Sequence, residues 1–349
     1  MKVLMVNREN AFSLLGGDTI QMIKTKESLE KLGVKVDVSL GTKDTNYYKN
    51  YDIVHIFNVQ TEKFSNKEAK KIKLANTPLV VSPIWWDFEE DLINNTQNYG
   101  KKMLFISKLI GIKNAKYLKS LKLKLKYKKI NEILDISSYI LPNSKMEIES
   151  LNRCFFYDNS KNFVIYNGIS EEFVKVSENN VKRKYALQVG RIEPAKNTLL
   201  TIKACNELKI PLKLVGRKVD QDYYEKCLIE SENGNVEFLD SQEHEKLIGI
   251  YTEAKVHILP SFRETPGLVS LEAGVLGCNI VSTNIGSAEE YFKTMVSYCN
   301  PNDFNSIKHA IHTEWNKQND NVLRHHIINN FTWDIAAENT LKIYKKLIR

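Results

Sequence analysis

The sequence predicts an α/β protein made of two domains, each built on a parallel sheet. Short apolar runs alternate with helical segments along the chain, and this alternation is typical of parallel sheets. The chain has 349 residues, 42% of them hydrophobic, which is enough for two globular cores. An Asn167-Gly168 turn signal lies near the middle and predicts the junction between the domains.

Each half of the chain predicts six short strands. Residues 2–6 form an apolar run, and the helix expected at residues 19–32 ends at Gly33, a natural helix stop. Thr332-Trp333 begins a final helix that is expected to reach residue 348. The expected strands lie near residues 2–6, 34–38, 52–57, 78–82, 138–142 and 163–166, and then near 185–189, 212–215, 236–239, 256–259, 279–282 and 296–298.

The most distinctive motif follows the apolar run of residues 256–260. Glu264 and Glu272 stand on either side of Gly267-Leu268, and a helix is expected to begin there. Open α/β sheets bind ligands at the carboxyl ends of their strands. Free N–H groups at a helix start favour an anion, and carboxylates accept hydrogen bonds from sugar hydroxyls. The alternative is a solvated helix start with acids near its positive end.

A second motif follows the expected strand of residues 185–189. Gly190-Arg191 ends this strand, and Lys196 stands just before the next helical run. Arginine offers phosphate oxygens a fork of donors and lysine offers a point charge, so the two suit a diphosphate. The alternative is two ordinary surface cations. A further short strand ends at Gly216.

In this order, ~70 residues apart, the two motifs resemble the G-R-x-x-x-x-K and E-x7-E signatures of retaining nucleotide-sugar glycosyltransferases of family 4, the glycosyl transferases group 1 type. The resemblance implies the GT-B fold. In that fold two Rossmann-like, doubly wound domains face each other across a cleft, and a C-terminal helix crosses back to the first domain. The resemblance also implies three catalytic residues, Glu264 on the sugar hydroxyls and Arg191 and Lys196 on the donor diphosphate.

The resemblance assigns donor contacts to several loops. Glu272 would hold the nucleotide ribose, and the loop after residues 236–239 would contact the base. Asp240 stands where the family usually has glycine, so the base stays open and a UDP-sugar or a GDP-sugar is expected. The donor-binding residues implied are Gly16, Gly17, Gly190, Gly216, Ser241, Gln242, Gly267, Leu268 and Glu272.

No cofactor and no metal are expected. Asp220-Gln221-Asp222 matches the D-x-D metal motif of the other major glycosyltransferase fold, but it lies away from the main motifs. We interpret it as a solvated loop. The five cysteines are scattered without disulfide or zinc spacing, which suits a reducing compartment.

Gly16-Gly17 follows the first strand. It resembles the family's Gly-Gly loop, which approaches the donor phosphates and the acceptor closely because glycine has no side chain. A plain tight turn is an equal alternative.

The acceptor site is expected in the first domain. Trp85 and Trp86 follow the expected strand of residues 78–82. Aromatic faces suit sugar rings and lipid linkers, and a buried core position is an equal alternative for each of these two tryptophans. Many family members carry a histidine near the position of these tryptophans, and this sequence has none there. The acceptor candidates are Trp85, Trp86 and Asp87 after residues 78–82, and His55 and Asn58 near the end of residues 52–57.

The family pattern sets the expected domain boundaries. Residues 1–168 would form the acceptor domain and residues 169–331 the nucleotide-sugar donor domain. Residues 332–349 would form the helix that packs back on the first domain.

The net charge of +8 is unevenly spread. No acid occurs between Asp91 and Glu132, whereas eleven lysines and interleaved apolar residues occupy Lys101–Lys129. Such a stretch can lie on an anionic membrane surface, and the alternative is a solvated pair of helices. Nothing resembles a base-reading module, so nucleic acid is not an expected partner.

No apolar run suits a signal peptide or a membrane span, so a cytoplasmic protein is expected. If the basic stretch binds lipid, the protein is expected to attach peripherally to the inner face of the membrane. The expected function is transfer of a sugar from a nucleotide sugar to a saccharide or polyprenyl-linked acceptor in bacterial surface-polysaccharide or glycolipid biosynthesis. Two alternatives stay open. One is a nucleotide-sugar epimerase of the same fold, and the other is an inactive basic scaffold at the membrane.

Overall fold

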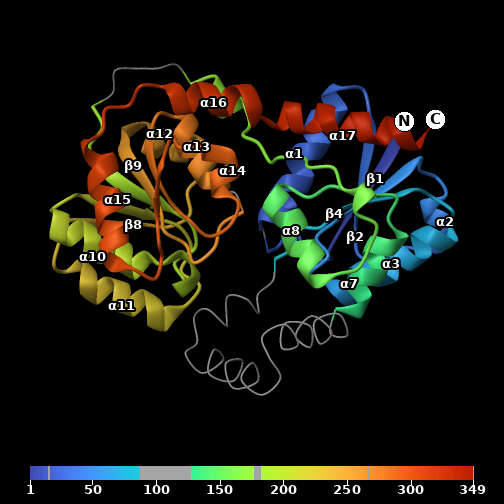
Figure 1. Cartoon of the computed structure of the whole chain (residues 1–349), viewed down its shortest axis with the longest axis horizontal. Helices are drawn as coiled ribbons and strands as arrows, with labels where there is room; N and C mark the ends of the chain where they lie inside the picture. Colours follow the sequence, from blue (N-terminus) through green and yellow to red (C-terminus); the bar gives the residue numbers. More distant parts are fainter. Residues whose placement is uncertain (15, 87–126, 177–181, 266, 349) are drawn as a thin grey trace, which may run out of the picture. The chain divides into compact units, whose positions relative to one another are not determined.

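The computed structural model describes residues 1–349 except 15, 87–126, 177–181, 266 and 349 (Figure 1). The chain forms two compact units, each with its own parallel sheet. The first unit contains Met1–Tyr166 and Ala336–Arg349, and the second contains Asn167–Ile335.

The first unit is built on a five-stranded parallel sheet with the strand order β2-β1-β3-β4-β5. The chain adds β2 on one side of β1 and then adds β3 on the other. The point where the order reverses therefore lies between β1 and β3, and ligands bind at such points in open α/β sheets. The strands are β1 Lys2–Asn7, β2 Lys35–Leu40, β3 Ile53–Phe57, β4 Leu79–Ser82 and β5 Tyr139–Ile140. The helices are α1 Gly17–Lys31, α2 Thr45–Tyr48, α3 Glu62–Leu74, α7 Lys128–Ile136, α8 Lys145–Cys154 and the short 3-10 helix η1 Asn159–Lys161.

The second unit is built on a six-stranded parallel sheet with the order β11-β10-β9-β6-β7-β8. Its order reverses between β6 and β9. The strands are β6 Tyr185–Val189, β7 Leu212–Val215, β8 Val236–Leu239, β9 Ala254–Leu259, β10 Asn279–Thr283 and β11 Ser297–Cys299. The helices are α9 Glu171–Val174, η2 Pro194–Lys196, α10 Thr198–Leu208, α11 Gln221–Ser231, α12 His244–Glu253, α13 Leu268–Val275, α14 Ala288–Phe292, α15 Phe304–Asn316 and α16 Val322–Asn330.

The final helix, α17 Trp333–Leu347, packs on the first unit as expected (Figure 1). Its Tyr344 is fully buried, and the hydroxyl of Tyr344 forms a 2.6 Å hydrogen bond with Nδ1 of His55 on β3. The two parallel-sheet α/β units expected from the sequence are confirmed.

One expected strand is absent from the described residues. Residues 163–166 were expected to form a sixth strand in the first half. Asn162, just before them, forms an isolated bridge with Ile140, and the N–H groups of Phe163 and Ile165 donate to the carbonyls of Ile140 and Pro142 without forming a strand. Continuing the parallel ladder needs a backbone N–H at Pro142, which proline lacks. The prediction of this strand was therefore wrong.

Buried side chains of β1, β3 and β4 form the first core, and those of β6, β9 and β10 form the second. All five cysteines are buried and free. Among the described helices, none is long and apolar enough to cross a membrane.

Candidate functional site

Both sequence motifs of the second half lie where the strand order of the second unit reverses. Gly190-Arg191 and Lys196 follow β6, and the segment with Glu264 and Gly267 follows β9. Because β6 and β9 are parallel neighbours, their carboxyl ends meet at one edge of the sheet. The fold therefore brings together two segments that are far apart in sequence.

The two motifs meet in an ion pair. The Nζ atom of Lys196 lies 2.8 Å from Oε2 of Glu264, and the two side chains are 21% and 12% exposed. Asn197 fixes the turn that carries Lys196. It has a left-handed backbone (φ 55°), and its buried amide donates to the carbonyls of Pro260 at 3.3 Å and Pro301 at 2.8 Å.

A glycine sets the backbone position of Glu264. Glu264 forms an isolated bridge with Gly286, its N–H donates to Ile285, and its carbonyl accepts from Ser287. Gly286 has a φ of 109°, and a Cβ there would lie 2.0 Å from the carbonyl oxygen of Glu264. Only glycine permits this approach.

Arg191 is half-exposed and pairs with a neighbouring acid. Its Nη2 atom lies 2.7 Å from Oε1 of Glu193, and Nε lies 3.1 Å from the same oxygen. Gly190 and Gly216 lie at the ends of β6 and β7, and a Cβ on Gly216 would lie 1.9 Å from the carbonyl oxygen of Gly190. These glycines keep the edge beside Arg191 free of side chains.

Glu272 lies in the middle of α13, whose first residue is Leu268 and whose N-cap is Gly267. The hydroxyl of Tyr251 donates a 3.1 Å hydrogen bond to Oε2 of Glu272. Burial raises the pKa of Glu272 to about 7, and the tyrosine bond opposes that rise. Its expected contact with a ribose stays a prediction.

The loop that the sequence predicts to contact the base follows β8 at the edge of the sheet. Ser241 is exposed, and the side-chain amide of Gln242 donates to the carbonyl of Asp240 at 2.8 Å. Their assignment to the nucleotide base also stays a prediction.

Asp220-Gln221-Asp222 is not the loop that we expected. Oδ1 of Asp220 accepts from the N–H of Tyr223 at 2.9 Å and caps α11, while Asp222 lies in the first turn. Aspartate favours this position because its oxygen satisfies a free helix N–H. No group of three or more His, Cys, Asp or Glu within the described ranges is arranged to hold a metal.

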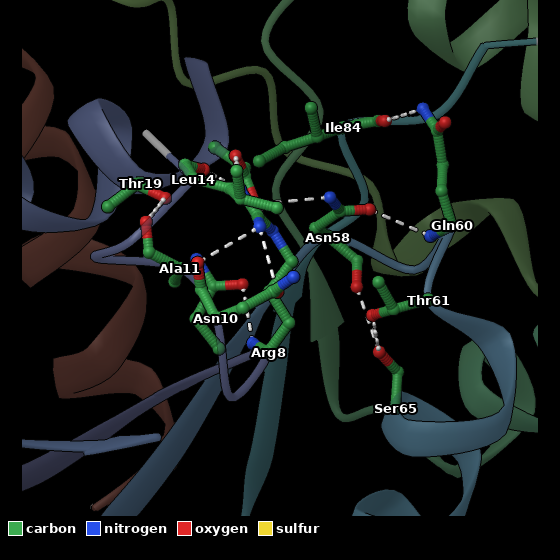
Figure 2. Close-up of polar contacts among 12 residues, drawn as sticks. Arg8, Asn10, Ala11, Leu14, Thr19, Asn58, Gln60, Thr61, Ser65 and Ile84 are labelled. Atoms are coloured by element: carbon green, nitrogen blue, oxygen red, sulfur yellow. Dashed lines mark hydrogen bonds and ion pairs between the residues drawn. The ribbon is translucent and has the colours of Figure 1, made fainter. Parts of the chain in front are cut away.

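In the first unit, Gly16 is the N-cap of α1 and Gly17 is its first residue. A polar network beside them was missed by the sequence analysis (Figure 2). Arg8, just after β1, donates from Nε to Oδ2 of Asp18 at 3.0 Å and from Nη2 to the carbonyl of Leu14 at 2.6 Å. The carboxylate packs against Gly16, where a Cβ would lie 2.8 Å from Oδ1 of Asp18. The available signal was an acid directly after Gly-Gly and an arginine at the end of the strand.

The network continues to the loops after β3 and β4 (Figure 2). The amide of Asn58 donates to Asp18 at 3.2 Å and accepts from the N–H of Gln60 at 2.8 Å, and the side chain of Gln60 donates to the carbonyl of Ile84 at 2.6 Å. Burial alone would raise the pKa of Asp18, but the bonds from Arg8 and Asn58 hold it below its usual value. Asn58 and Ile84 both have positive φ, 73° and 49°. For a β-branched residue such as Ile84 this is a strained backbone.

Two acceptor candidates are core residues in the structure. His55 is 1% exposed, its ring nitrogens bond Tyr344 and Ser82, and burial lowers its pKa to about 3. Trp85 is 3% exposed and packs edge-on against Tyr127 and Phe155.

These two positions therefore need correction. Both side chains are buried in the first unit, so neither ring is exposed to an acceptor. Asn58 is partly buried within the network, Trp86 is partly buried, and Asp87 lies outside the described residues.

Comparison with known proteins agrees with this geometry. Residues 169–331 match the family model described as glycosyl transferases group 1. HepE from Anabaena, solved in complex with UDP, has a TM-score of 0.73 at 16% identity, with 99% of this chain and 100% of that chain covered. A glycosyltransferase from Rickettsia africae has a TM-score of 0.72 at 15% identity, with 100% and 98% covered.

The sequence relatives are distant. O-antigen chain mannosyltransferase B of Escherichia coli is 26% identical over 63% of this chain and 64% of its own length. An uncharacterized protein of the cps region of Klebsiella pneumoniae is 28% identical over 52% of this chain. The match spans just over half of that relative, 54% of its length.

The two parallel-sheet units define a protein of the GT-B fold. The resemblance drawn from the sequence is confirmed for the fold of the chain and for its second unit, which matches the model of glycosyl transferases group 1.

Proposed function

We propose that the chain is a retaining, metal-independent hexosyltransferase that takes its sugar from a nucleoside diphosphate sugar, UDP- or GDP-linked. The acceptor is a saccharide or a polyprenyl-linked saccharide in bacterial surface-polysaccharide or glycolipid biosynthesis. The relatives that include an O-antigen chain mannosyltransferase and a cps-region protein support this setting.

The Lys196–Glu264 ion pair carries the proposal. It holds a phosphate-binding cation and a hydroxyl-binding carboxylate 2.8 Å apart. In a sugar diphosphate the anomeric carbon joins the sugar to the phosphate, so the two groups that must be recognised are also adjacent. A bound donor fits this pair with the sugar on Glu264 and the phosphate on Lys196.

The same residues suit the chemistry. Breaking the bond between the anomeric carbon and the phosphate oxygen builds negative charge on the leaving diphosphate. Fixed cations and backbone N–H groups stabilise that charge without reorganising. Arg191, Lys196 and the backbone of Gly267-Leu268 are the groups assigned to this task.

Single alanine substitutions test the assignment. Arg191→Ala and Lys196→Ala are each expected to lower kcat/KM by at least roughly 2 kcal/mol in transition-state terms, as loss of an oxyanion donor does. The assay uses UDP- and GDP-sugars with a panel of saccharide and polyprenyl-linked acceptors. Near wild-type turnover by either folded variant would contradict the assignment of that residue to the leaving diphosphate.

Removal of divalent metal tests the second part of the proposal. Activity is expected to survive EDTA, because side-chain cations stabilise the leaving group. Complete loss of activity that Mn²⁺ or Mg²⁺ restores would contradict metal independence. Release of free or epimerised sugar without acceptor would instead favour the epimerase alternative.

A further inference from the structure

The two cations assigned to the diphosphate are each already paired with a carboxylate. Arg191 bonds Glu193 through two nitrogens, at 2.7 and 3.1 Å, and Lys196 bonds Glu264 at 2.8 Å. These four side chains have no net formal charge. A nucleoside diphosphate brings about two or more negative charges at neutral pH. An additional cation at this edge would compensate them.

Arg217 is a cation at the same edge. It directly follows Gly216 at the carboxyl end of β7, and it is exposed. Its guanidinium has no hydrogen-bond or ion-pair partner in the part of the chain that the structure describes. Five N–H donors in a planar fork are therefore free to bind phosphate oxygens.

The pairing of β6 and β7 continues past both strands and places Arg217 beside Arg191. The N–H of Ile192 donates to the carbonyl of Arg217 at 2.9 Å, and Ile192 forms a parallel bridge with Lys218. In this register Arg191 lies opposite Arg217, and neighbouring strands are about 5 Å apart. The two guanidinium groups can therefore reach the same ligand.

Arg217 and the next residue, Lys218, lie on opposite faces of the extended chain. Nζ of Lys218 lies 4.8 Å from the centre of the Tyr224 ring on α11 and 3.6 Å from Asp240. Ile192, the bridge partner of Lys218, is buried in the same core as Tyr224. Successive residues of an extended chain point to opposite faces, so Arg191 and Arg217 share the face away from α11.

We propose that Arg217 is a further phosphate-binding residue, which supplies the uncompensated positive charge that holds the diphosphate of the donor. The ligand named here rests on the proposed function. Arg217 contributes to affinity for the diphosphate group and not to affinity for the nucleoside.

Calorimetric titration of the full chain tests the proposal. The probes are UDP, GDP, inorganic pyrophosphate, uridine and guanosine, and the variants are Arg217→Ala, Arg217→Lys and Lys218→Ala. Arg217→Ala is expected to weaken binding of pyrophosphate and of the preferred nucleoside diphosphate about tenfold or more, as loss of a charged hydrogen bond does. Arg217→Lys is expected to retain part of that affinity. Lys218→Ala is the matched control on the opposite face and is expected to bind as the wild type does.

The outcomes separate this inference from the proposed function. Equal affinity of wild type and Arg217→Ala for pyrophosphate and the nucleoside diphosphates overturns the inference alone. Arg217-dependent binding of pyrophosphate, with no sugar transfer from any nucleotide sugar, supports the phosphate site and overturns the proposed function. A wild-type chain that binds none of these phosphates overturns both.

Discussion

Glu264 and Glu272 have different surroundings, and this difference separates their expected roles. Glu264 is held by Lys196 at the loop after β9, whereas Glu272 accepts a hydrogen bond from Tyr251 within α13. We expect Glu264→Ala mainly to impair sugar-dependent turnover and Glu272→Ala mainly to weaken nucleotide binding. Calorimetry with the bare nucleotide and with the nucleotide sugar measures the two effects. Equal loss of bare nucleotide affinity in both variants would contradict the division.

Glu272 also predicts a dependence of stability on pH. Its folded pKa of about 7 lies above the ordinary glutamate value of 4.5, so the folded state binds the proton more tightly than the unfolded state. The contribution of the protonated side chain is present at low pH and is lost as pH rises from about 4.5 through 7. Glutamine at this position has no proton to lose and can still accept the tyrosine bond.

The free energy of unfolding of Glu272→Gln, relative to that of the wild type, is therefore expected to increase as pH rises from 5 to 8. The gain is roughly 2 kcal/mol, which is less than the full shift implies because the side chain is partly exposed. Urea unfolding of both proteins at the two pH values measures it. If the free energies of unfolding of the two proteins differ by the same amount at pH 5 and at pH 8, Glu272 titrates normally.

Residue types with a sequence motif were easier to assign than those without one. The spacing of the motifs indicated Lys196 and Glu264, and the fold brings them into contact. Nothing local separates the core histidine His55 from a ligand-binding one, because its hydrogen-bond partner Tyr344 is 289 positions away in the sequence. Arg8 was missed for the opposite reason, since its partner Asp18 becomes a neighbour only when the loop after β1 closes.

At the scale of elements, the loop that contains Gly286 fixes the backbone of Glu264. Gly286→Ala forces a Cβ to within 2.0 Å of a carbonyl oxygen at a positive φ. We expect a loss of stability of roughly 2–4 kcal/mol and a large loss of turnover, because Glu264 must move. Chemical unfolding and steady-state kinetics measure the two effects.

Gly249→Ala is the matched control for this prediction. Gly249 is an exposed residue in the interior of α12, and a Cβ there meets nothing within 4 Å. Alanine favours a helix interior, so this variant is expected to gain about 0.5–1 kcal/mol. A Gly286→Ala variant with wild-type stability and turnover would contradict the proposed restraint on Glu264.

Buried strands were the most predictable elements. Eleven of the expected strands are present, because short apolar runs bounded by turn residues have few other ways to bury themselves. The strand expected at residues 163–166 does not form, because Pro142 lacks the backbone N–H that the parallel ladder needs. The apolar pattern of these residues does not show this. The D-x-D segment was taken for a loop because the capping role of Asp220 was not considered.

For the whole molecule, the alternation of strands and helices predicted two parallel-sheet units. It did not fix their strand order, because the order depends on which edge of the sheet each crossover returns to. The Gly16-Gly17 segment follows β1, and the two motifs of the second half follow β6 and β9, so each lies where the strand order of its own unit reverses. In open α/β sheets, ligands bind at such points. The acceptor remains the least predictable part of the function.

The charge distribution of the whole chain predicts attachment to a membrane. Residues 101–126 of the basic stretch Lys101–Lys129 lie outside the described residues, and Lys129 already pairs with Glu62 at 3.7 Å. We expect the protein to sediment with anionic liposomes at low salt and not with neutral ones. Binding should weaken at high salt, because exposed charges are screened beyond about 8 Å at physiological ionic strength.

Charge-matched variants locate the contact. Replacing Lys116, Lys119 and Lys122 by glutamine is expected to weaken liposome binding, since each lysine near the surface contributes up to about 1 kcal/mol. The same change at Lys182, Lys226 and Lys246, exposed lysines of the second unit, removes equal charge and is expected to have little effect. If both triple variants bind alike, net charge rather than the basic stretch attracts the lipid. If the wild type ignores anionic liposomes at low salt, a soluble saccharide becomes the better acceptor.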